Sequence, residues 1–174
     1  MGNIGTAAKS QGHDVWGNED VFGGEMETKL VSVLKAGPAV GGDGWKTTTI
    51  MVPYVVVGEE YGWSSANVLG CLDLKMGAVI LRNQDADVLA HEAQHYYDFV
   101  VLGHRCGCPE DYLISELRAE LNSFRSNNTM AKAIALAAAH VHAGAQKGGW
   151  SYLARPSKAK VRDTMLSIVK PHVS

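Results

Sequence analysis

Residues 25–35 place their apolar side chains at helical spacing. The positions that would share one helical face are Met26, Leu30, Val33 and Leu34. Gly37-Pro38 follows and is typical of a helix end. We therefore expect a helix over residues 25–35. Residues 1–24 are rich in glycine and polar side chains and show no period, so we expect a loop-like N-terminal extension there.

Two later segments have the composition of strands. Residues 47–57 are dense in Thr, Ile and Val, which favours a strand, and Pro53 within this segment favours an edge position or a bulge. Residues 76–82 contain a second short apolar run. We expect both segments to be strands of one small mixed sheet.

Helical patterns dominate the rest of the chain. A helix should begin at Asp85 or Asp87 and continue to about Leu102, with Gly103 as its end. Further helical segments begin at 109, after the break at 126–129, and at 158, where Ser157 is the expected cap. Strands followed by helices predict an α+β fold, and 174 residues suit a single domain over 1–174.

Composition and charge narrow the classes of function. Hydrophobic residues make up 46% of the chain, which is enough for a core, and the formal net charge of −2 argues against a nucleic-acid partner. The sequence lacks a transmembrane run and a basic, apolar secretory signal. We expect a cytoplasmic protein, or one released without a signal peptide, and association with a virion stays open. Cys71, Cys106 and Cys108 predict free thiols rather than a disulfide framework.

The sequence His91-Glu92-Ala93-Gln94-His95 carries the candidate chemistry. Residues four apart on an α-helix project from the same face, so the imidazoles of His91 and His95 can bind one zinc ion together. Glu92 lies at the flank of that face, where a carboxylate can accept a proton from an activated water. This H-E-x-x-H arrangement is typical of zinc metallopeptidases.

A catalytic zinc needs a third protein ligand. Asp98 and Val101 occupy the positions where metzincins have Gly and His, which excludes that pattern. The segment Ser115–Asn122 on the next predicted helix resembles the glutamate helix of gluzincin metallopeptidases, because Glu116, Ala119 and Glu120 match its spacing. The resemblance covers residues 76–124 and implies a zincin-like fold, Zn²⁺ as cofactor and Glu116 as third ligand. Glu120 would then orient a ligand histidine, and Asp98 would hold the end of the helix or bond a ligand without binding the metal itself. The reverse assignment of Glu116 and Glu120 stays open.

The same resemblance implies zinc-dependent hydrolysis of peptide bonds, with Glu92 as general base and a protein or a cell-wall peptide as substrate. The oxyanion stabiliser could be Tyr152, His142 or His140. The strand at 77–82 could pair with an extended substrate. The alternative is a zinc-stabilised structural or binding component of a larger assembly, such as a phage particle or a toxin complex, with little or no turnover.

Overall fold

A computed structural model describes residues 20–21, 24–35, 44–148, 150 and 153–170. By its contacts the chain divides into two compact units. Unit 1 comprises residues 1–31 and 49–103, and unit 2 comprises residues 32–48 and 104–174. The single domain expected over 1–174 stays a prediction.

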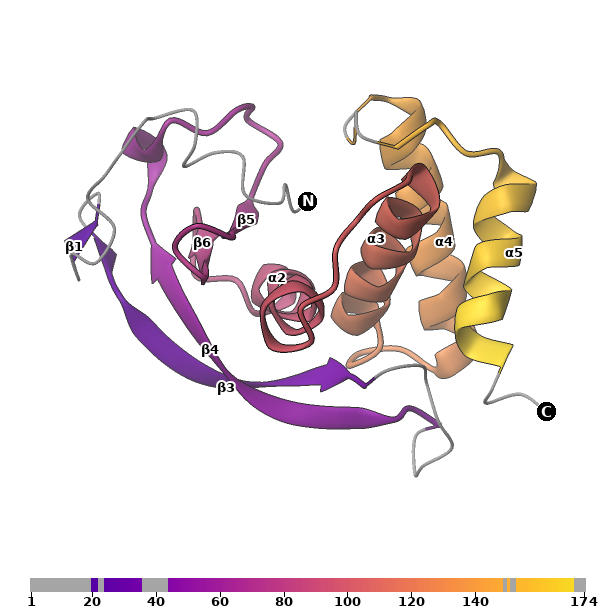
Figure 1. Cartoon of the computed structure of the whole chain (residues 1–174), viewed down its shortest axis with the longest axis horizontal. Coiled ribbons are helices and arrows are strands. Elements are labelled where there is room, and N and C mark those ends of the chain that lie inside the picture. Colours follow the sequence, from indigo (N-terminus) through magenta and orange to yellow (C-terminus); the bar gives the residue numbers. More distant parts are fainter. Residues whose placement is uncertain (1–19, 22–23, 36–43, 149, 151–152, 171–174) are drawn as a thin grey trace. The chain divides into compact units, whose positions relative to one another are not determined.

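A four-stranded mixed sheet precedes four α-helices, which confirms the predicted α+β class (Figure 1). The strands are β3 (Glu27–Leu34), β4 (Thr47–Val56), β5 (Gly70–Asp73) and β6 (Ala78–Leu81). Their order in the sheet is β3-β4-β6-β5. Strand β6 runs parallel to β4 and antiparallel to β5.

The helix expected over 25–35 is wrong. The chain there forms the short strand β2 (Gly24–Glu25) and then β3. Only Val33 and Leu34 of the predicted apolar face are buried, whereas Leu30 is 62% exposed. The β-branched Thr28, Val31 and Val33 favour extended backbone, and this preference overrides the helical spacing.

The expected N-terminal loop is also wrong where the structure describes it. Strand β1 (Asp20–Val21) pairs antiparallel with β2, and Asp20 lies opposite Glu25. A Cβ atom at Gly24 would collide with the backbone oxygen of Val56, so only glycine permits this close approach. The rest of the expected extension, residues 1–19 and 22–23, lies outside the described residues.

Pro53 lies inside β4, which has neighbouring strands on both sides. Strand β4 as a whole is therefore not an edge strand, but its ladder to β6 begins one residue after the proline, at Tyr54 opposite Val79, so the missing N–H of Pro53 costs no bond in that ladder. The alternative of a bulge at Pro53 stays a prediction. Strand β6 itself lies between β4 and β5. It therefore has no free edge for the extended substrate that we expected to pair at 77–82.

In unit 1, a hydrophobic core lies beside the sheet and the helix α2 (Ala86–Tyr96) packs on β5 and β6. One cluster of buried residues in this core comprises Val55, Val57, Tyr61, Cys71 and Ile80. A 3₁₀ turn, η1 (Glu59–Tyr61), places Tyr61 in this core. Burial is the main cause that raises the pKa of the Tyr61 phenol, and the nearby Cys71 and Asp73 add to the effect.

In unit 2, three helices pack against one another: α3 (Pro109–Phe124), α4 (Met130–Gln146) and α5 (Lys158–Val169). Their positions confirm the predicted helical segments. The hydroxyl of Ser157 accepts a hydrogen bond from the backbone N–H of Lys160 and caps α5, as predicted. Among the described residues, no helix is both long enough and apolar enough to cross a bilayer.

Candidate metal centre

Helix α2 begins where the sequence predicted. The Asp85 carboxylate accepts hydrogen bonds from the backbone N–H groups of Asp87 and Val88, at 2.9 and 3.1 Å. This cap fixes the first turn, and packing on β5 and β6 fixes the buried face of the helix. The residues of α2 that are buried are Leu89, His91, Glu92, Ala93, Gln94 and His95. Four of these six side chains are polar, which is unusual for the buried face of a helix.

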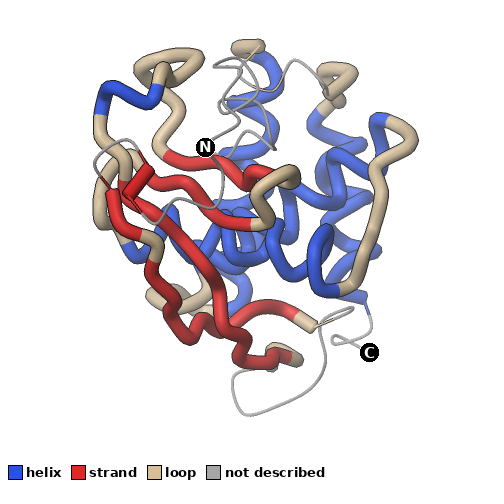
Figure 2. The backbone as a smooth tube through the Cα atoms, turned by 60° about the vertical axis from the view of Figure 1, so that its left-hand side comes forward, coloured by secondary structure: helices blue, strands red, loops and turns tan. Residues whose placement is uncertain are grey.

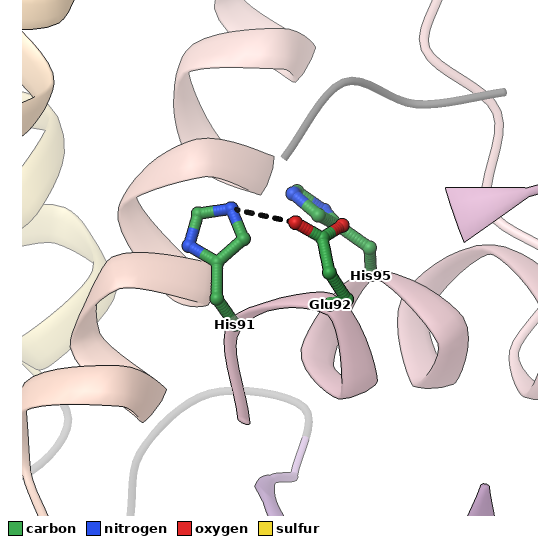
Figure 3. A group of neighbouring side chains, drawn as sticks. All are labelled: His91, Glu92 and His95. Atoms are coloured by element: carbon green, nitrogen blue, oxygen red, sulfur yellow. Dashed lines mark ion pairs between the residues drawn. The ribbon is translucent and has the colours of Figure 1, made fainter. Parts of the chain in front are cut away.

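The side chains of His91, Glu92 and His95 converge above α2 (Figure 3). One potential ligand atom from each residue lies within 4.8 Å of the others. The Nε2 of His91 is 3.8 Å from the Oε2 of Glu92, and the two imidazole centroids are 4.9 Å apart. Among the described residues, this is the one group of three or more His, Cys, Asp or Glu side chains with such a geometry.

The donor set of this cluster fits a metal ion. His91 is 4% exposed, and Glu92 and His95 are 0% exposed. Burying two imidazoles and a carboxylate together costs free energy unless each is compensated by hydrogen bonds or by a cation. Imidazole nitrogen and carboxylate oxygen are both common ligands of divalent transition metals. The buried triad on α2 could therefore bind a metal.

The chain continues from α2 into a π-helical turn, η2 (Tyr97–Val101). Gln94, inside the motif, donates a hydrogen bond of 3.1 Å from its Nε2 to the Oδ1 of Asp98, and both residues are buried. The ring of Phe99 stacks on that of His95, with centroids 5.9 Å apart. The bond between Gln94 and Asp98 thus connects α2 with the π-helical turn. The expected role of Asp98 at the metal stays a prediction.

Glu116 and Glu120, the two predicted glutamates of the second helix, both lie on α3 of unit 2. They are 0% and 4% exposed, so neither belongs to a solvated helix face. A carboxylate on a buried helix face needs compensating interactions, which is the property expected of a ligand or of a residue that orients one. The assignment of Glu116 as third metal ligand stays a prediction.

Glu120 has a partner that the sequence did not suggest. Its Oε2 lies 2.7 Å from the Nδ1 of His140 on α4, and the His140 side chain is 46% exposed. The rings of Phe124 and Trp150 meet the imidazole edge-on, with centroids 6.0 and 6.2 Å away. One side of the imidazole is thus held by a carboxylate while the ring reaches solvent.

His142 and Tyr152 are the other two predicted candidates for oxyanion stabilisation. His142 lies on α4, two residues beyond His140, and is half-buried. Tyr152 lies outside the described residues. The assignment of an oxyanion stabiliser to any of the three stays a prediction.

All three cysteines are free thiols, as predicted. Cys71 is buried in the core of unit 1, and Cys106 and Cys108 flank Gly107 before α3. The N–H of Gly107 donates a hydrogen bond of 2.9 Å to the Oδ2 of Asp111. This bond is the main reason why the pKa of the Asp111 carboxyl lies below its usual value, so the loop before α3 is held by a carboxylate and not by a disulfide.

No family model, no curated protein and no solved structure matches the chain. The candidate metal centre is therefore defined by its own residues: two histidines one turn apart, a glutamate beside them, and burial of all three.

Proposed function

We propose that this chain is a zinc-dependent peptidase whose chemistry takes place at His91, Glu92 and His95. The observation that carries the proposal is the burial of these three side chains with ligand atoms within 4.8 Å of one another. A helix that packs on two strands would ordinarily present apolar residues at these positions. Their replacement by two imidazoles and a carboxylate favours a chemical role over a structural one.

Zinc is the metal that this donor set suits best. Catalytic zinc sites commonly combine two imidazoles with one carboxylate and keep one position open. In the proposal His91 and His95 supply the imidazoles and Glu116 supplies the carboxylate. The complete burial of Glu116 supports this choice, as does its four-residue spacing from Glu120 on α3.

When bound, the ion would act as a Lewis acid that acidifies a water molecule and polarises the scissile carbonyl. Glu92 would accept a proton from the attacking water while the oxygen of the water adds to the carbonyl carbon. The C–N bond then breaks, and Glu92 returns the proton to the leaving nitrogen. One carboxylate thus serves as base and then as acid, and the peptide bond is hydrolysed without net consumption of protons.

His140 is the residue that we assign to the developing oxyanion. A carboxylate within hydrogen-bond distance of Nδ1 orients the imidazole ring. An N–H at the other ring nitrogen, Nε2, would donate to an oxyanion. Glu120 is accordingly a positioning residue for His140, and His142 and Tyr152 take no part in the proposed mechanism.

The proposal is tested by incubating the zinc-loaded chain with a broad peptide library and with cell-wall peptides, followed by mass spectrometry. Cleavage is expected for the unmodified chain. Glu92→Gln should lower kcat by roughly 100-fold or more without loss of zinc, because it removes only the proton transfer. Glu25→Gln, at an exposed position on β2, is the matched control and should retain full activity.

Absence of cleavage by the zinc-loaded chain in all of these substrates would contradict the peptidase proposal. If chelation then lowered the melting temperature with no activity to lose, the metal would be structural, and the alternative of an assembly component would replace the enzyme.

A further inference from the structure

Strand β3 is an edge strand of the sheet. Within the described residues its one neighbouring strand is β4, and no described strand lies along its other edge (Figure 2). Residues 27–30 are exposed on both faces of the sheet, and Leu30 is 62% exposed. Glu25, two residues earlier, is paired with Asp20 of β1. The free stretch is therefore residues 26–30, and free strand edges are templates for a further strand.

The second half of the same strand is contacted by two arginines, one on α3 and one directly after it. The guanidinium of Arg118 donates a hydrogen bond of 2.9 Å to the backbone oxygen of Leu34. Arg125 donates one of 2.8 Å to the Oγ of Ser32. Basic side chains beside a strand edge hinder the addition of a further strand. The part of β3 that is open to such addition is therefore its first half, together with the residue before it, residues 26–30.

The backbone direction of the free stretch follows from one hydrogen bond. The N–H of Lys35 points to β4, where it donates to the oxygen of Lys46, so the backbone groups of the preceding residue, Leu34, are expected to point the other way. Because backbone groups alternate along a strand, Thr28 and Leu30 share the outward direction of Leu34. Their N–H and C=O groups are the ones offered to an added strand.

We propose that residues 26–30 pair antiparallel with the same residues of a second copy, about a two-fold axis at Thr28. This register places Glu27 opposite Lys29 of the second copy, and Lys29 opposite Glu27, so that two cross-strand ion pairs form. On the other sheet face Met26 lies opposite Leu30, which covers an apolar side chain that is now exposed. The segment is thus complementary to itself, as a two-fold interface requires.

The charges also select the register. An axis at Lys29 would place two lysines directly opposite each other, and an axis at Glu27 would do the same with two glutamates. Only an axis at Thr28 brings opposite charges together. The ladder is short and its flanks are solvated, so the dimer should be weak and concentration-dependent.

Sedimentation velocity over a concentration series tests the proposal on the full chain. The unmodified chain should pass from monomer to dimer as its concentration rises. Lys29→Glu, which sets four glutamates along the interface, should abolish the dimer, and so should Thr28→Pro, which removes an outward N–H. The double exchange Glu27→Lys with Lys29→Glu should restore dimerisation, since it swaps the pairs without changing the register.

Lys132→Glu on α4 makes the same change of net charge at an exposed position and should leave the dimer intact. Circular dichroism of every variant separates misfolding from loss of pairing, and the restored double exchange does so independently. A chain that stays monomeric at its highest attainable concentration overturns the proposal. So does a dimer that Lys29→Glu leaves intact, or a Lys29→Glu monomer that the double exchange fails to rescue.

Discussion

The Nδ1 atom of His140 lies 2.7 Å from the Oε2 atom of Glu120, across the packing of α4 on α3. Glu120 is buried and His140 reaches solvent, so the pair connects the interior of unit 2 with its surface. A carboxylate that receives the ring N–H of a histidine fixes the orientation and the tautomer of that imidazole. The proposed role of His140 at the oxyanion rests on this orientation.

The pair should also stabilise unit 2, which a double-mutant cycle can measure. His140→Ala leaves the buried Glu120 carboxylate without this hydrogen bond and should lower the free energy of unfolding by about 1–3 kcal/mol. Glu120→Gln followed by His140→Ala should cost less than the sum of the two single changes. Urea unfolding of the four variants gives the coupling, and a coupling near zero would mean that the pair contributes nothing to stability.

Tyr61 should make the stability of the protein fall at alkaline pH. Burial raises the pKa of its phenol in the folded chain above the value of about 10 in the unfolded chain. The stabilisation from neutral Tyr61 is therefore complete below pH ~10 and is lost as the pH rises above it, because only the unfolded chain then releases the proton.

Tyr61→Phe removes this titration, so its free energy of unfolding should fall less steeply above pH ~10 than that of the unmodified chain. Absorbance titration gives an independent reading: of the six tyrosines, at least one should ionise only when the chain unfolds. Equal alkaline slopes for the two proteins would show that the phenol of Tyr61 is not buried as described.

Gly144 should resist replacement although it lies inside helix α4. A Cβ atom there would lie 2.9 Å from the Trp150 ring, which is too close for contact with a buried indole. Helix propensity alone predicts that Gly144→Ala stabilises by about 1 kcal/mol. The steric conflict predicts a loss of roughly 1–3 kcal/mol instead.

Thermal unfolding shows whether Gly144→Ala raises or lowers the stability of the chain. The exposed Ala139, on the same helix, provides the comparison: Ala139→Gly should cost about 1 kcal/mol through propensity alone. A Gly144→Ala variant that melts above the unmodified chain would contradict the described packing of Trp150.

The sequence predicted best those features that depend on neighbours along the chain. Asp85 and Ser157 were recognisable as caps because each bonds to N–H groups two or three residues later. The cluster of His91, Glu92 and His95 was predictable for the same reason, since one helical turn brings all three together. Local geometry alone places these side chains.

Features that depend on distant contacts escaped prediction. The partner of Glu120 is twenty residues away on another helix, and no spacing rule connects them. Strand β3 was mistaken for a helix because its apolar residues have helical spacing, whereas its extended form is set by pairing with β4. Strand β5 is only four residues long and contains a glycine, so propensity gave no signal for it.

The central claim is that His91, Glu92 and His95 form a metal site, and zinc titration by calorimetry tests it most directly. The unmodified, metal-free chain should bind one zinc ion tightly. His91→Ala and His95→Ala should each weaken binding by at least about 100-fold, because a structural or catalytic zinc cannot lose an imidazole without large cost. Glu92→Gln should bind zinc nearly as well as the unmodified chain. A chain that binds no zinc, or binds it equally after both histidine substitutions, would contradict the account.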